Sequence, residues 1–194
     1  MNEVPIVPKL NKNKIESKTD EIVRSIYPDA WKGVEPVPID QLFEIDAPLL
    51  LQIKTDYADL TTSFGIDAHG YTELTKRISI VNAAVADDYS ENGRRFYRAT
   101  TGHELGHCFL HIPLERWIAS RQNLGLAMHR NRCEMKPCEN PEWQAWHFCK
   151  ALAMPRHLVH YALRKYGHGK AGILAMMDMF DMNYSFVESR LRTL

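Results

Sequence analysis

The residues most able to do chemistry lie in the segment TTGHELGHCFLH, where His103, Glu104 and His107 form the pattern H-E-x-x-H. Residues four apart on an α-helix share one face, about 6 Å apart along the axis, so the two imidazoles can bind one tetrahedral zinc ion. Glu104 lies about 100° around the helix from His103, where it can reach a metal-bound water without being a ligand. The pattern therefore predicts a hydrolytic zinc site with Glu104 as the general base.

Such a site needs a third protein ligand. His111 is about 12 Å from His103 along a continuous helix, too far to share one ion, so we expect it behind the ligands or at the surface. Glu142 begins the segment EWQAWHFCKALAMP and would complete a His₂Glu set from a second helix, which Ala145 would allow to approach closely. The alternative is that Glu142 only favours a helix N-terminus.

Four cysteines in the middle of the chain are the rival metal ligands: Cys108, Cys133, Cys138 and Cys149. Together they could hold a structural Cys₄ zinc ion, although their spacing is not the usual paired one. Reduced, buried thiols are the alternative, and the absence of a signal peptide favours it. We therefore expect one zinc ion per chain, at the histidine site.

Two residues farther along the chain, His160 and Tyr161, could donate a hydrogen bond to the oxyanion of a tetrahedral intermediate. A lone histidine or tyrosine on a helix more often packs or faces solvent. The predicted catalytic set therefore contains Glu104 alone.

The elements that must position these residues are helices around a small sheet. Apolar spacing predicts helices at residues 15–26 and 39–45, and the motif helix at 95–111. Short runs rich in β-branched residues predict three or four antiparallel strands between residues 49 and 82, including LLLQI, TTSFGI and RISIVN. RISIVN, if it forms the sheet edge beside the motif helix, could bind a substrate as an added strand.

After an irregular stretch at residues 112–141, prolines bound a helix at 142–154. Helices are also expected at 157–166 and 171–181, and a last one, capped by Asn183, runs to Leu194. The predicted fold class is α+β, with a small antiparallel or mixed sheet, in a single domain spanning residues 1–194. Its parts are a helical front at 1–48, the sheet and metal-site helices at 49–156, and C-terminal helices at 157–194.

Composition and charge exclude several functions. The 194 residues include 24 Lys and Arg and 24 Asp and Glu, so no net charge attracts the chain to nucleic acid or to an anionic membrane. No apolar run of about 18 residues is present, and the first residues lack an apolar signal region. We expect a cytoplasmic protein with no membrane partner.

The motifs together resemble the ImmA/IrrE family of metallopeptidases. The resemblance rests on five segments and covers most of the chain from about residue 37 onward: PVPIDQLFE, RISIVN, RATTGHELGHCFLH, EWQAWHFCKALAMP and FDMNYSFVESRLRTL. The sequence departs from the family before the motif, where Gly102 stands, and in the cysteine-bearing segment between His111 and Glu142.

The resemblance implies a zincin-like core in which a small sheet packs on the H-E-x-x-H helix. It places the metal ligands on His103, His107 and Glu142, and the catalytic glutamate on Glu104. Members of the family typically cut helix-turn-helix repressors, often encoded beside them in mobile elements or stress-response operons. A protein substrate of that kind is the implied partner, with no direct binding of nucleic acid.

Two other functions remain open from the sequence. The first is a zinc-containing regulatory protein that sequesters a repressor, or senses a signal through it, without turnover. The second is a DNA-binding helix-turn-helix at the chain's end, which is weaker because Arg190 and Arg192 are its only basic residues.

Overall fold

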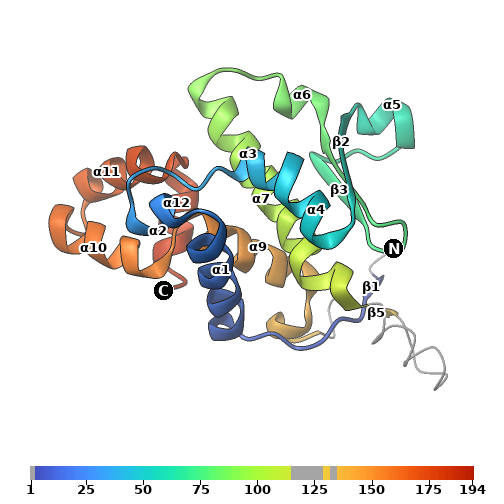
Figure 1. Cartoon of the computed structure of the whole chain (residues 1–194), viewed down its shortest axis with the longest axis horizontal. Coiled ribbons are helices and arrows are strands. Elements are labelled where there is room, and N and C mark those ends of the chain that lie inside the picture. The colour runs from blue at the N-terminus through green and yellow to red at the C-terminus, as the bar shows by residue number, and fades with distance from the viewer. Residues whose placement is uncertain (1–2, 115–128, 132–134) are drawn as a thin grey trace.

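The computed structural model describes residues 3–114, 129–131 and 135–194. The chain has the mixed α+β fold that the sequence predicts, with helices around a small sheet. Two helices cross the middle of the molecule, α7 (Glu91–His111) and α9 (Pro141–Ala153). The sheet lies on one side of α7, and the C-terminal helices lie on the opposite side of the molecule (Figure 1).

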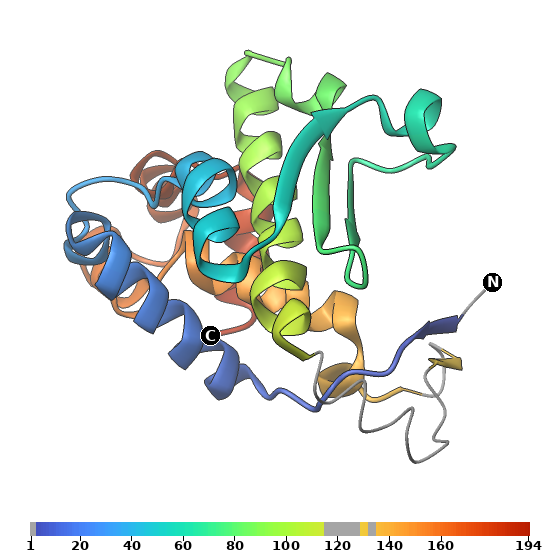
Figure 2. The same cartoon turned by 45° about the vertical axis from the view of Figure 1, so that its right-hand side comes forward.

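The sheet contains β2 (Lys54–Ala58), β3 (Gly70–Glu73) and β4 (Ile78–Asn82) in the order β2-β4-β3. β4 is parallel to β2 and antiparallel to β3, so the sheet is mixed, which is one of the two arrangements that the predicted fold class includes. RISIVN is its central strand, with a neighbour on each edge. The expectation that RISIVN could be the sheet edge is therefore wrong, and β3 is an edge strand that contacts α7. Figure 2 shows the three strands of the sheet on one side of the molecule.

Two predicted strands are helices. LLLQI lies mostly in α4 (Ala47–Leu51), where Pro48 occupies the first turn and supplies the fixed φ that a helix start accepts. TTSFGI lies mostly in α5 (Leu60–Phe64), where the Asp59 side chain accepts the backbone N–H of Thr62 and Gly65 ends the helix with φ 66°. Capping residues outweigh the β-propensity of these short runs.

The remaining helices follow the predicted order. At the N-terminal end are α1 (Lys12–Ile26), α2 (Pro28–Lys32), α3 (Ile39–Gln41) and a π-helical turn, Leu42–Asp46. α6 (Ala83–Ala86) connects β4 to the loop before α7. Short 3₁₀ turns occupy Ile112–Leu114 and Pro137–Glu139. The C-terminal part contains α10 (Arg156–Tyr166), α11 (Lys170–Phe180) and α12 (Tyr184–Leu191), and Asn183 caps α12 as predicted.

Two helices approach closely where the sequence provides small residues. A Cβ atom on Gly106 of α7 would lie 2.7 Å from both Cα and the carbonyl oxygen of Ala145 on α9. A Cβ on Gly102 would lie 2.8 Å from Sγ of Cys149. The contact that Ala145 was expected to allow is therefore present, and it also requires both glycines.

The two ends of the chain also pack into this arrangement. α1 packs against α9, and the N-terminal strand β1 (Glu3–Pro5) pairs antiparallel with β5 (His129–Asn131). Arg190 of α12 and Glu16 of α1 form an ion pair, and both are buried. Among the described residues, no helix has the length and apolar character needed to cross a membrane.

Candidate metal centre

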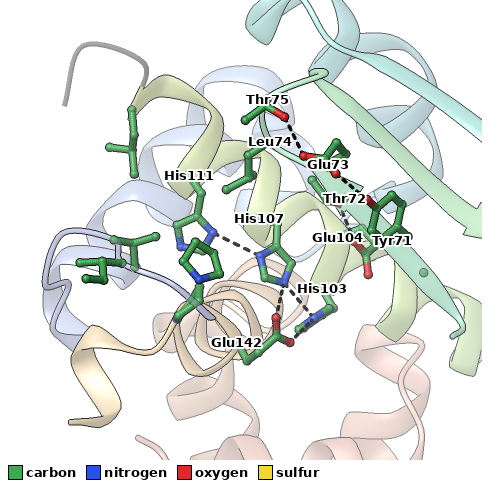
Figure 3. A pocket seen from close by; sticks show the side chains of 16 residues that line it. Tyr71, Thr72, Glu73, Leu74, Thr75, His103, Glu104, His107, His111 and Glu142 are labelled. Carbon is green, nitrogen blue, oxygen red and sulfur yellow. Dashed lines mark hydrogen bonds and ion pairs between the residues drawn. The ribbon is translucent and has the colours of Figure 1, made fainter. Parts of the chain in front are cut away.

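Three predicted ligands converge on one point between α7 and α9. Nε2 of His103 and Nε2 of His107 are 3.2 Å apart, and the two carboxylate oxygens of Glu142 each lie 3.3 Å from one of these nitrogens (Figure 3). Atoms at two corners of a tetrahedron, each bound to one zinc ion at about 2.1 Å, are about 3.4 Å apart. With either carboxylate oxygen as the third ligand, two of the three separations already match those of a tetrahedral ion, and all three ligand atoms lie within 4.8 Å of one another.

The backbone explains why these atoms meet. His103 and His107 are one turn apart on α7 and point to the same side. Glu142 lies in the first turn of α9, after Pro141, and the side chain of Asn140 accepts its backbone N–H. The close approach at Gly106 brings this helix start within reach of both histidines.

The charges of the site favour a cation. Hydrogen bonds from His103 and His107 hold the pKa of the Glu142 carboxyl far below its usual range. Burial opposes protonation of His107, but its hydrogen bond to Glu142 and the charges of Glu104 and Glu142 raise its pKa overall. Two carboxylates thus act on one pair of imidazoles, so a divalent ion fits the charge of the site as well as its geometry.

Glu104 is next to the ligands but does not belong to the converging set. The hydroxyl of Thr72 on β3 donates a 2.6 Å hydrogen bond to its carboxylate. The hydroxyls of Thr72 and Ser79 are 2.9 Å apart, so Ser79 must donate to Thr72. A Cβ on Gly70 would lie 2.5 Å from the Glu104 carboxylate, so β3 passes directly over this side chain.

His111 lies behind the ligands, one of the two positions expected for it. It is 1% exposed, its Nδ1 is 3.2 Å from Nδ1 of His107, and its Nε2 is 3.0 Å from Oε1 of Gln144. Burial and the neighbouring His107 lower the pKa of His111 to about 3. His111 is therefore neutral in the folded protein.

The ligands open into a cavity of about 580 Å³ (Figure 3). One wall is β3 and the turn after it, and another is the N-terminal segment from Pro5 to Val7. Leu74 and Leu114 add apolar surface, and Tyr71 adds a hydroxyl that donates to Glu73. A chain segment with apolar side chains would fit beside the metal centre.

His160 and Tyr161 do not line this cavity. Both lie on α10, and Tyr161 is 45% exposed. An aromatic neighbour that sequence reasoning missed is Trp146, whose ring lies 4.4 Å from that of His103.

The cysteines form no alternative metal cluster in the described part of the chain, where the metal-ligand grouping is His103, His107 and Glu142. Cys108 and Cys149 are fully buried, and burial raises the pKa of each thiol to about 12. Cys138 is half-buried and free, and Cys133 lies outside the described residues. Thiols that stay protonated are poor metal ligands.

Sequence reasoning also missed Thr72, Ser79 and Gln144 as neighbours of the site. His111 was expected near the site, because it lies four residues after His107 on the same helix face. The other three come from distant segments and carry no local pattern.

Comparison with known proteins adds no relative. The chain matches no protein-family model, and a search of curated proteins finds no match. The case for a function therefore depends on the geometry and chemistry of the site.

Proposed function

We propose that the chain is a zinc-dependent endopeptidase with a zincin-like core, similar to the ImmA/IrrE metallopeptidases. One observation carries the proposal: two histidine nitrogens and a carboxylate converge within 4.8 Å of one another, beside a second, hydrogen-bonded carboxylate. His103, His107 and Glu142 would hold the ion. When bound, zinc would lower the pKa of a coordinated water and polarise the scissile carbonyl.

Glu104 takes the proton from the attacking water and passes it to the leaving amine. The Thr72 hydroxyl keeps one carboxylate oxygen occupied and holds the side chain in place. The hydrogen bond therefore orients the carboxylate that acts as the general base. The sequence alternative of a zinc protein without turnover gives no role to a carboxylate oriented in this way.

A polypeptide substrate would lie along β3. In the described part of the chain β3 pairs on one side only, with β4, and its residues from Gly70 to Glu73 line the cavity. Backbone groups of an added strand would pair with this edge, and the apolar walls would accept side chains. The proposed substrate-binding strand is therefore β3 and not RISIVN.

The proposed substrate is a helix-turn-helix repressor, which follows from the family resemblance. DNA binding by the chain itself is not part of the proposal. Arg190 is 0% exposed and pairs with Glu16, and Arg192 lies 3.4 Å from Glu188 on the same helix. The last helix and its C-cap therefore offer one exposed arginine, Arg192, which is too few for a phosphate-binding surface.

Elemental analysis and peptide cleavage test the proposal together. We expect about one zinc per chain in the wild type and in Cys133→Ser/Cys138→Ser, and loss of zinc in Glu142→Ala. Glu104→Gln should keep zinc and lose cleavage of a proteome-derived peptide library, read by mass spectrometry. Zinc that is lost in Cys133→Ser/Cys138→Ser and kept in Glu142→Ala would refute the metal site. Zinc at the histidines with no cleavage of the library or of a neighbouring repressor would favour the regulatory binder.

A further inference from the structure

A buried chain of hydrogen bonds behind His107 has no part in the mechanism above. It runs from Nδ1 of His107 to Nδ1 of His111, and from Nε2 of His111 to the side-chain oxygen of Gln144. The amide nitrogen of Gln144 then contacts the carbonyl oxygens of Pro8 and Cys138, at 2.9 and 2.8 Å. Gln144 is fully buried, so water does not replace these partners.

The contacts fix which way the Gln144 amide points. Carbonyl oxygens only accept hydrogen bonds, so the atom facing both of them must be the amide nitrogen, and both of its hydrogens are used. The opposite orientation would place the Gln144 oxygen against two other oxygens. The atom facing His111 is therefore an acceptor only.

The orientation of Gln144 then fixes the hydrogens on both imidazoles. Nε2 of His111 must carry a hydrogen, because it faces an acceptor. His111 is buried and contacts no carboxylate, so it is neutral and its Nδ1 has a lone pair. Nδ1 of His107 must then donate to it. A neutral His107 has only one ring hydrogen, which leaves the lone pair of its Nε2 facing His103 and Glu142.

We infer that His111 and Gln144 are positioning residues, which hold His107 in the tautomer and ring orientation that a metal ion at the proposed centre requires. The inference rests on the proposed metal binding and extends it to two residues that do not touch the ion. His103 provides a contrast, because its Nδ1 is buried without a hydrogen-bond partner among the described residues.

The same amide also holds the N-terminal segment against the site. Pro8 directly follows the residues Pro5 to Val7 that line the cavity, and the backbone N–H of Leu10 donates to the same Cys138 carbonyl at 3.0 Å. The buried Gln144 side chain therefore holds a wall of the cavity in place and, through His111, also sets the tautomer of His107.

Three substitutions separate this role from simple packing. Gln144→Met keeps the length of the side chain and removes both kinds of hydrogen bond. His111→Leu removes the acceptor for His107, whereas His111→Asn keeps an amide oxygen that can replace Nδ1. Gln41→Met is the matched control, because Gln41 is exposed on α3.

Two readouts apply to the full-length protein: long-range ¹H–¹⁵N NMR of the histidine rings, and the zinc dissociation constant from chelator competition. In the wild type we expect the hydrogen of His107 on Nδ1 and that of His111 on Nε2. The zinc dissociation constant should rise about 10–100-fold in Gln144→Met and His111→Leu. It should rise less than about tenfold in His111→Asn, and stay unchanged in Gln41→Met.

Two results would overturn the inference: a His111 hydrogen on Nδ1 in the wild type, or a zinc dissociation constant within about twofold of wild type in both Gln144→Met and His111→Leu. If Gln144→Met fails to fold, the ratio of the zinc dissociation constants of His111→Leu and His111→Asn decides whether the inference holds. The His111 tautomer is also readable in zinc-free protein. Failure of wild type to bind zinc would therefore count against the proposed function, and a wrong tautomer against this inference alone.

Discussion

At the scale of single residues, a short series of hydrogen bonds orients the Glu104 carboxylate. Glu104 accepts from Thr72, which in turn accepts from Ser79 on the adjacent strand. Ser79 is fully buried, so its hydroxyl has no competing water. The carboxylate is thereby oriented from the sheet, whereas the metal ligands come from helices. Base and ligands can therefore be disturbed independently.

Thr72→Val should lower kcat/KM by about 10–100-fold, because a hydrogen bond to a charged group contributes about 1.5–3 kcal/mol. Zinc content should not change, and Thr72→Ser should restore most of the activity. The measurement is cleavage of a library-derived peptide at saturating zinc.

Thr75→Val is the matched control for this prediction. Thr75 has the same side chain in the adjacent turn, but its hydroxyl donates to Glu73 and not to Glu104. An equal loss of activity in both variants would mean that Thr72 acts through the shape of the turn and not through Glu104.

At the scale of elements, the metal centre depends on how closely α9 lies against α7. Gly106 contacts the backbone of Ala145, which is three residues after Glu142 on the same helix. A shift of α9 away from α7 would therefore move the Glu142 carboxylate away from both histidines.

Gly106→Ala tests this dependence. Helix propensity alone favours alanine by about 1 kcal/mol, but its Cβ would lie 2.7 Å from backbone atoms that cannot rotate away. We expect a net loss of about 1–3 kcal/mol in the free energy of unfolding, measured in urea, together with weaker zinc binding.

Gly169→Ala is the control, because a Cβ at Gly169 meets no atom within 4 Å. It should change the free energy of unfolding by less than about 1 kcal/mol and leave zinc affinity unchanged. A stabilised Gly106→Ala protein with normal zinc affinity would show that the metal centre does not depend on this close approach.

At the scale of the whole molecule, a buried ion pair joins the two ends of the chain. Arg190 of α12 donates two hydrogen bonds to the carboxylate of Glu16 on α1, and its Nε donates to the carbonyl oxygen of Met154 after α9. Burial opposes ionisation of Glu16, but its hydrogen bond with Arg190 and the charges of Arg190 and Arg156 lower its pKa overall.

Removing one member of this pair leaves the other charge buried. Arg190→Met should therefore destabilise the fold by about 3–5 kcal/mol near pH 7, measured by urea unfolding. Glu16→Met/Arg190→Met should recover much of that loss, because neither buried charge of the pair remains. A double variant no more stable than Arg190→Met would show that shape, and not charge, determines this contact.

The pair also predicts the sign of a pH dependence. The pKa of Glu16 is lower in the folded protein than its usual value of 4.5, so the carboxylate contributes stability above about pH 4.5 and loses it as pH falls further. Nearby Asp20, whose pKa is raised by burial and by Glu16, acts in the opposite direction. The stability advantage of wild type over Glu16→Gln should therefore shrink below about pH 4.5.

Local sequence determined the parts of this protein that depend on short spacing. The four-residue interval between His103 and His107 fixes two ligands on one helix face, and Pro141 and Pro155 bound the helix that carries Glu142. Helices at both ends followed from periodicity and capping. The strand predictions failed at LLLQI and TTSFGI, because short apolar runs carry little information and the caps Pro48 and Asp59 decided them.

Only the tertiary structure decided how the site is completed. Glu104 meets Thr72 across 32 residues, and Gln144 meets Pro8 across 136, and no periodic pattern connects such positions. Strand order was decided in the same way, since RISIVN has the composition of a buried strand whether it is central or at an edge. Helix geometry is set by neighbours in the chain, whereas buried hydrogen bonds are satisfied by whichever polar group the packing brings near.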